Sequence, residues 1–116
     1  MDKFFQAVIE ANRQIIKLIE TTQPEKLYEK LSLGAGGDIS IFADVEAEKI
    51  FVKHLKEFGN IFSEECGWLE GASSDEIIID PIDGSDNFVS NHPYYGTSVA
   101  RKRDGKCIQA CVVNLA

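Results

Sequence analysis

An acidic motif follows directly after the strand-like stretch 76–79. Its nine residues are Asp80-Pro81-Ile82-Asp83-Gly84-Ser85-Asp86-Asn87-Phe88. From Glu57 to Ala100, both included, the chain contains nine Asp or Glu residues and no Lys or Arg. Carboxylates packed closely without a cation raise one another's pKa by repulsion, whereas a bound divalent metal keeps them ionised. The motif therefore predicts a strand end that holds a metal ion.

The composition indicates one globular domain. The chain has 116 residues, of which 44% are hydrophobic and 27% charged, which suits a single core. A net charge of −7 argues against a nucleic-acid or anionic-membrane surface, since only Arg101-Lys102-Arg103 forms a short basic cluster. No stretch approaches the roughly 20 apolar residues of a membrane span, and no hydrophobic leader begins the chain. We therefore expect a cytoplasmic protein that binds neither nucleic acid nor membrane.

Two amphipathic helices are predicted in the first half of the chain. Apolar residues recur at three-and-four spacing over residues 4–19, and this helix should end near Pro24. A second helix should cover residues 47–58. Asp44 stands where its N-cap would lie, and Gly59 stands where a glycine would end it.

Most of the remaining chain predicts strands. Residues 25–33 are ambiguous, because Pro24 could open a short helix while the leucines could equally lie on a strand. Strands are expected at residues 39–43, 61–63, 77–79, 94–101 and 106–114. A polar loop should run from Glu64 to residue 74, and Asp104-Gly105 favours the type I′ turn of a hairpin. This order predicts an α+β fold with two helices packed on a mainly antiparallel sheet.

Acidic residues at three strand ends supply candidate metal ligands. They are Glu64 and Glu65 after one strand, Asp80 and Asp83 after another, and Asp38 and Asp44 around a third. Oxygen ligands indicate a hard cation such as Mg²⁺ or Mn²⁺ rather than zinc. The backbone carbonyl of Ile82 could turn inward between the two carboxylates of the acidic motif. An EF-hand is excluded, because Pro81 and Ile82 occupy positions where that loop needs acidic or amide residues.

The residues after this motif suggest an anion site. If a helix begins after Gly84-Ser85, its first amide groups and its dipole face whatever lies above the metal. Such a position suits a phosphate group. A metal ion beside an anion site indicates phosphoryl chemistry.

Three sequence blocks occur in order along the chain. They are Gly37-Asp38-x-x-x-x-Ala43-Asp44-x-x-Ala47-Glu48, Ser63-Glu64-Glu65 and Asp80-Pro81-Ile82-Asp83-Gly84-Ser85-x-Asn87-Phe88. Together they resemble the N-terminal half of the inositol monophosphatase and fructose-1,6-bisphosphatase superfamily. The resemblance implies the layered α/β sugar-phosphatase fold. It also implies Mg²⁺-dependent hydrolysis of a small phosphorylated polyol or sugar, such as an inositol phosphate or fructose bisphosphate.

The resemblance assigns roles to individual residues. The implied metal ligands are Glu64, Asp80, Asp83 and the carbonyl of Ile82. Asp44 and Ser85, together with Glu64, are the implied catalytic residues, and the first two would position and activate the attacking water. The amides of Gly84 and Ser85 would hold the phosphate. Glu65 is expected to lie behind the metal ligands.

One family block is missing from the sequence. The later Trp-Asp block, whose aspartate completes a second metal site, has no counterpart, because Trp68 is followed by Leu69-Glu70. Residues 1–116 are therefore expected to form the metal- and phosphate-binding N-terminal half, with the C-terminal half absent and the activity of this chain alone in doubt. Two alternatives stay open. One is a non-catalytic metal-binding or structural half that forms a homodimer or pairs with a partner, and the other is a phosphoadenosine-phosphate phosphatase.

Overall fold

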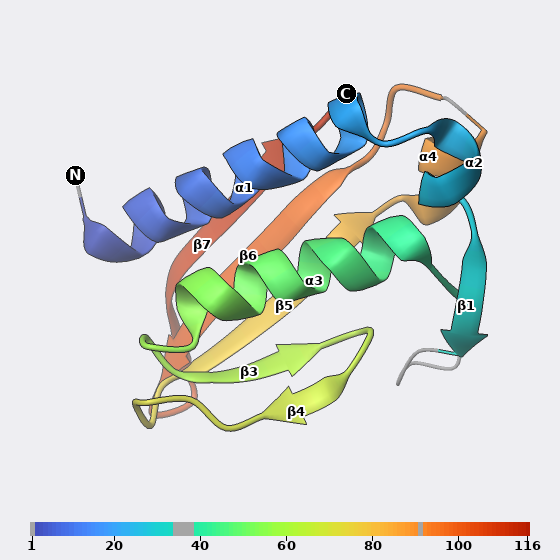
Figure 1. The fold of residues 1–116 in the computed structure, drawn as a ribbon. Helices are drawn as coiled ribbons and strands as arrows, with labels where there is room; N and C mark the ends of the chain where they lie inside the picture. The colour runs from blue at the N-terminus through green and yellow to red at the C-terminus, as the bar shows by residue number, and fades with distance from the viewer. Residues whose placement is uncertain (1, 34–38, 91) are drawn as a thin grey trace.

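The fold has two layers, a five-stranded sheet and a pair of helices on one of its faces (Figure 1). The computed structural model describes residues 2–33, 39–90 and 92–116. The elements in chain order are α1 (Lys3–Thr21), α2 (Pro24–Leu27), β1 (Lys30–Leu33), β2 (Ile39–Ile41), α3 (Phe42–Leu55), β3 (Asn60–Ser63), β4 (Gly67–Leu69), β5 (Glu76–Asp83), α4 (Ser85–Val89), β6 (Gly96–Arg103) and β7 (Lys106–Asn114). The predicted α+β class is confirmed.

The sheet order is β4-β3-β5-β6-β7, with β1 and β2 forming a separate antiparallel pair. Strands β3 and β5 run parallel, and the other neighbours in the sheet are antiparallel. The mainly antiparallel sheet expected from the sequence is therefore correct.

The core lies between the sheet and helices α1 and α3. Its buried apolar residues are Phe4, Val8, Ala11, Ile15, Leu27, Ile41, Ala43, Ala47, Phe51, Leu55, Ile61, Ile77, Ile79, Ile82, Phe88 and Val99. Full burial of one large apolar side chain contributes about 1.5–3 kcal/mol. One polar link crosses this core: Thr97 Oγ1 donates to Asn12 Oδ1 at 2.7 Å, and Asn12 Nδ2 donates to the carbonyl of Val8 at 2.8 Å.

The first half of the chain follows the predicted order with shifted boundaries. Helix α1 matches the expected helix, and Asp2 caps it by accepting the N–H of Phe4 at 2.8 Å. The ambiguous residues 25–33 contain both predicted alternatives, the short helix α2 and then strand β1. The glycine-rich turn and Asp38 lie outside the described residues.

Gly59 was expected to be the glycine that ends the second helix, but the helix ends four residues earlier. Helix α3 ends at Leu55, and Gly59 has no positive φ. A Cβ added to Gly59 would lie 2.4 Å from the backbone oxygen of Asp75. The position therefore requires glycine because two backbone segments approach closely.

Two further predictions concern the strands. The expected polar loop after Glu64 contains strand β4, which pairs antiparallel with β3. The Asp104-Gly105 turn is confirmed, since both residues have positive φ, 53° and 78°, as a type I′ turn requires.

Two residues of the basic cluster at the end of β6, Arg101 and Arg103, pair with the buried carboxylate of Asp75. Arg101 Nε lies 2.9 Å from Asp75 Oδ2, and Arg103 donates to both carboxylate oxygens of Asp75 at 2.9 and 3.0 Å. Asp75 is only 4% exposed. The Arg101 guanidinium also lies 5.1 Å from the centre of the Phe4 ring.

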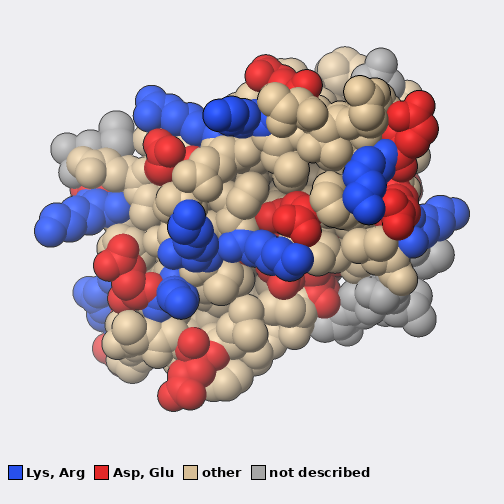
Figure 2. All heavy atoms as spheres, in the orientation of Figure 1, with Lys and Arg blue, Asp and Glu red and all other residues tan. Residues whose placement is uncertain are grey.

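The helix-covered side of the molecule carries both signs of charge. Figure 2 shows Lys and Arg side chains interspersed with Asp and Glu over this face. Within the described part of the chain, no helix is both long and apolar enough to cross a membrane.

Candidate metal and phosphate site

The parallel pairing of β3 and β5 places their carboxyl ends side by side. Ser63 is in register with Ile79, so the next residues, Glu64 and Asp80, come at the same edge of the sheet. Glu64 lies close enough to Asp80 for its charge to raise the pKa of Asp80. The two strand ends therefore meet at one edge of the sheet, with Asp80 and Asp83 within β5 rather than beyond its end, while the site roles of these residues stay predictions.

Asp80 is a carboxyl group whose ionisation is disfavoured. Its partial burial raises its pKa to about 7, and repulsion from Glu64, Asp83 and Glu65 adds to the effect. Its Oδ1 is buried and has no hydrogen-bond partner among the described residues. A carboxylate in this position needs a positive charge to stay ionised at neutral pH.

Asp44 lies at the start of α3 and joins the same cluster. It was predicted as the N-cap, but the helix begins at Phe42, so Ile41 is the N-cap and Asp44 is the third helical residue. Its Oδ2 accepts the backbone N–H of Ile41 at 3.1 Å, which satisfies one free donor of the helix start. The carboxyl group therefore stabilises the helix start from inside the first turn.

The other oxygen of Asp44 makes it a functional candidate. The residue is 2% exposed, and its Oδ1 has no partner among the residues described. Burial raises its pKa to about 6, with further repulsion from Glu65 and Glu64. The acidic residues that follow β3 thus disfavour the ionised form of Asp44.

Two serines hold the segment that carries Glu64 and Glu65. Ser40 donates its hydroxyl to Glu65 Oε2. Ser63 donates to Glu48 Oε2 at 2.9 Å and accepts the backbone N–H of Glu65 at 3.2 Å. Ser40 was not among the predicted site residues. Its only signal was its place in the predicted strand 39–43, just before Asp44.

The predicted helix after Gly84 is confirmed as α4, a helix of five residues. Gly84 is its N-cap with a φ of 87°, and a Cβ there would lie 2.7 Å from the backbone oxygen of Tyr94. Both facts require glycine. Asn87 Nδ2 donates to the same oxygen at 2.8 Å. The helix start is therefore fixed to the loop before β6, while the roles of the Gly84 and Ser85 amides stay predictions.

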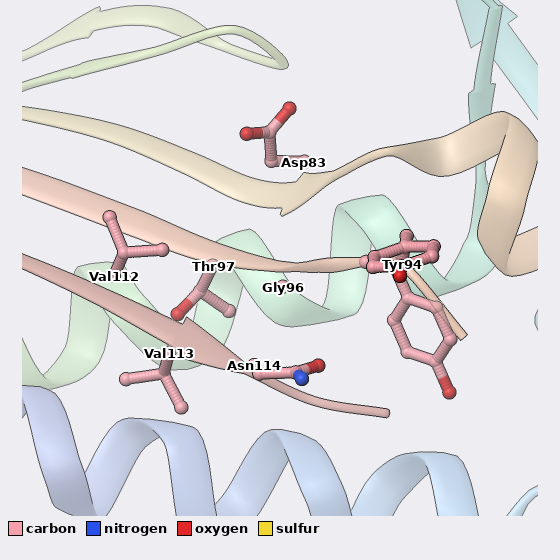
Figure 3. Close-up of a pocket in the computed structure, with 8 residues that line it drawn as sticks. Asp83, Tyr94, Gly96, Thr97, Val112, Val113 and Asn114 are labelled. Carbon is pink, nitrogen blue, oxygen red and sulfur yellow. The ribbon is translucent and has the colours of Figure 1, made fainter.

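A cavity of about 210 Å³ opens beside Asp83 (Figure 3). It is lined by Asp83, Tyr94, Tyr95, Gly96, Thr97, Val112, Val113 and Asn114. In Figure 3 the carboxylate of Asp83 points away from Thr97 and Asn114. Asp83 is the one proposed metal ligand among the residues that line this cavity.

The chemistry of the cluster fits a divalent metal. Among the described residues, no three His, Cys, Asp or Glu side chains are close enough together to hold one ion. The donors are nevertheless all oxygens, and two buried carboxylate oxygens, one on Asp44 and one on Asp80, have no partner there. A buried acceptor without a partner costs about 1–3 kcal/mol, and a hard cation removes that cost. The predicted ligand set, including the carbonyl of buried Ile82, stays a prediction.

The fold is that of the N-terminal part of known sugar and inositol phosphatase structures. A solved inositol monophosphatase–fructose 1,6-bisphosphatase superposes with a TM-score of 0.84 and 24% identity, over 99% of this chain and 46% of that one. An inositol monophosphatase from Thermotoga maritima gives a TM-score of 0.74 and 27% identity, over 96% of this chain and 44% of that one.

The chain belongs to the inositol monophosphatase family, whose sequence pattern matches residues 1–116. It is 33% identical over 91 residues to the fructose-1,6-bisphosphatase/inositol-1-monophosphatase of Thermococcus kodakarensis, covering 78% of this chain and 34% of that protein. It is 34% identical over 111 residues to Nus factor SuhB of Vibrio cholerae, covering 92% of this chain and 40% of that protein. The chain thus spans well under half the length of these relatives, and the resemblance to the N-terminal half of the family is confirmed.

Proposed function

We propose that this chain carries the metal- and phosphate-binding half of a Mg²⁺-dependent phosphomonoesterase. The observation that supports this most directly is the meeting of Glu64 and Asp80 at the ends of parallel strands, beside the buried carboxyl group of Asp44. Relatives are named for inositol monophosphate and fructose 1,6-bisphosphate. A small phosphorylated polyol or sugar is therefore the proposed substrate class.

Four groups of this chain are the proposed metal ligands. Glu64, Asp80, Asp83 and the Ile82 carbonyl would hold Mg²⁺, or Mn²⁺ in its place. When bound, such an ion lowers the pKa of coordinated water and neutralises charge on the phosphoryl oxygens.

The remaining residues handle the water and the phosphate. Asp44 would accept the proton of the attacking water, with Ser85 orienting that water, and the amides of Gly84 and Ser85 would hold the phosphate. Glu65, fixed by Ser40 and the backbone contact to Ser63, would keep the strand end in place. The ester bond breaks as the bond from water oxygen to phosphorus forms, and the leaving alcohol oxygen takes up a proton from solvent water, so no phosphoenzyme is needed.

Activity of the chain by itself is a separate question. Because the chain covers 34% and 40% of the relatives described above, we expect little turnover without further residues around the substrate. A non-catalytic half-domain is the alternative function. The cytoplasmic location stays a prediction. The absence of a nucleic-acid partner also stays a prediction, and one relative is named as a Nus factor.

Metal binding is the direct test of the proposed site. We would titrate Mn²⁺ into the chain and follow the free ion by electron paramagnetic resonance, comparing the natural sequence with Asp83→Asn. Asp86→Asn is the matched control, because Asp86 is an exposed carboxylate of the same motif. The natural chain and the control should bind equally, and Asp83→Asn should weaken binding at least about tenfold, as loss of one charged metal contact would. Equal weakening in both variants would refute the site.

Turnover then separates the phosphatase from a purely metal-binding domain. Phosphate release from inositol phosphate and fructose bisphosphate should depend on Mg²⁺. Any release should fall about 10²–10⁴-fold in Asp44→Asn, the usual effect of losing a general base. Metal binding with no release from either substrate would favour the half-domain, whereas release that Asp44→Asn leaves intact would remove Asp44 from the mechanism.

A further inference from the structure

Glu48 belongs to the first of the three sequence blocks and has no part in the proposed mechanism. Its Oε2 accepts the hydroxyl of Ser63 at 2.9 Å, which joins the second turn of α3 to the last residue of β3. Figure 1 shows that α3 begins at the end of the sheet where β3 ends. Glu48 therefore connects the helix that carries Asp44 with the strand end that carries Glu64.

The residues on both sides of Glu64 are anchored. Ser63 is only 6% exposed, and its hydroxyl accepts the backbone N–H of Glu65 at 3.2 Å while donating to Glu48. The side chain of Glu65 accepts the hydroxyl of Ser40, which is 3% exposed. Hydrogen bonds in such a setting are strong because water does not compete for the donors and acceptors. The backbone of Glu64 is thus held from both directions.

Helix α3 joins the two ends of this series of hydrogen bonds. Asp44 and Glu48 are four residues apart, so they lie on one face of the helix, one turn from each other. Asp44 also accepts the backbone N–H of Ile41, the residue that follows Ser40. The contacts therefore form a closed ring through α3, β3 and β2, with Asp44 on one side and the segment around Glu64 on the other.

We propose that Glu48 is a positioning residue, which acts through Ser63 to fix the distance between Glu64 and the helix that carries Asp44. This inference rests on the proposed function, in which Glu64 binds the metal and Asp44 accepts a proton from the attacking water. Such groups must be held within about 0.5 Å of their productive positions. The role requires an acceptor for the Ser63 hydroxyl and does not require a negative charge.

Two substitutions separate the position of the Glu48 side chain from its charge. Glu48→Gln removes the charge but keeps a side-chain oxygen that can accept the Ser63 hydroxyl, whereas Glu48→Ala removes both. In the Mn²⁺ titration, Glu48→Ala should weaken binding about tenfold, the lower end of the effect of residues that orient metal ligands. Glu48→Gln should retain most of the affinity. Equal weakening in the two variants would mean that Glu48 acts only by its charge and would overturn the proposal.

Glu46→Ala is the matched control, because it also removes a carboxylate from α3. Glu46 lies two residues earlier and pairs with Lys49 at 3.1 Å, so this variant should bind Mn²⁺ as the natural chain does. Ser63→Ala removes the other partner of Glu48 and should weaken binding by itself, which also provides the comparison if Glu48→Ala fails to fold. Adding Glu48→Ala to Ser63→Ala should cause little further loss, since the two residues act as a unit. Additive losses would contradict the proposal.

Amide hydrogen exchange without metal measures the anchoring directly. Glu48→Ala should speed exchange of the Glu65 amide about fivefold, the effect of losing roughly one hydrogen bond, while Glu48→Gln and Glu46→Ala should leave it unchanged. Thermal unfolding in EDTA would show that each variant is folded. An unchanged Glu65 amide in folded Glu48→Ala would refute the ring.

Comparison with the metal-ligand variant Asp83→Asn separates this inference from the proposed function. If Asp83→Asn weakens Mn²⁺ binding and Glu48→Ala does not, the proposed metal site stands and the positioning role of Glu48 is refuted. If neither variant weakens binding, the proposed site itself fails and the positioning role fails with it. Weakening in both, with rescue by Glu48→Gln, supports the role.

Discussion

Replacing Asp80 with asparagine should strengthen the fold when metal is absent and remove the response to metal. Burial and repulsion raise the pKa of Asp80 from 3.8 to about 7 in the folded chain. At low pH the group is protonated in both the folded and the unfolded chain and costs nothing. As the pH rises from about 4 to about 7, the unfolded chain loses this proton first, so stability falls, and the loss is complete above pH 7.

The size of this penalty follows from the pKa difference. One pKa unit corresponds to about 1.4 kcal/mol, so Asp80 acting alone would cost the metal-free fold about 4 kcal/mol at pH 8. Because the residue is partly open to solvent, which screens these charges, we take about half of that value. Asp80→Asn should therefore stabilise the metal-free chain by about 2 kcal/mol, or raise its Tm by about 8 °C.

Thermal unfolding with EDTA or with Mg²⁺, at pH 4, 6 and 8, measures both effects. The gap between the variant and the natural chain should vanish at pH 4 and be largest at pH 8. Saturating metal should remove this difference in stability. A ligand at about 100 times its dissociation constant adds roughly 2.7 kcal/mol to the free energy of unfolding, and only the natural chain should gain it. Asp86→Asn should change neither curve. If Asp80→Asn weakens the metal-free fold at pH 8, or gains as much from Mg²⁺ as the natural chain, the electrostatic reasoning is wrong.

Two further predictions concern buried polar contacts, an ion pair beside β5 and β6 and a hydrogen bond between the sheet and α1. Asp75→Asn removes the carboxylate that pairs with Arg101 and Arg103, so urea denaturation at pH 7 should show a loss of about 2 kcal/mol. The two arginines hold the pKa of Asp75 below its usual value, so the loss should persist above pH 4 and shrink as acid protonates Asp75; an unchanged loss in strong acid would contradict the ion-pair account. Thr97→Val leaves the buried Oδ1 of Asn12 without its donor and should cost about 1–3 kcal/mol. In a double-mutant cycle with Asn12→Leu the two costs should not add, and simple additivity would mean that the hydrogen bond contributes nothing.

The sequence predicted elements whose signal is local. The three-and-four spacing over residues 4–19 reflects one buried helix face, and the Asp104-Gly105 dipeptide determines its own turn. The acidic motif could be placed at a strand end because a β-branched run precedes it. Each of these signals lies within a few residues of the element that it predicts.

The missed features depend on contacts between distant segments. Gly59 is required by the backbone of Asp75, sixteen residues later, and not by the helix before it. Strand β4 has three residues, too few for a periodic pattern, and it forms because β3 lies beside it. The hydrogen bond from Ser40 to Glu65 joins two blocks of sequence that share no local pattern. For the same reason the position of Asp44 relative to Glu64 could be inferred only from the family resemblance.

The single parallel pair in the sheet determines how closely the charges of the site can approach. A slip of β5 by one residue against β3 would move Asp80 by about 3.3 Å along the strand and turn it to the other face. Ile77 and Ile79 of β5, buried beneath the helices, oppose such a slip because both would be turned out into water. These isoleucines contact no substrate in the proposed mechanism. A substitution that loosens them should therefore weaken metal binding before it unfolds the chain.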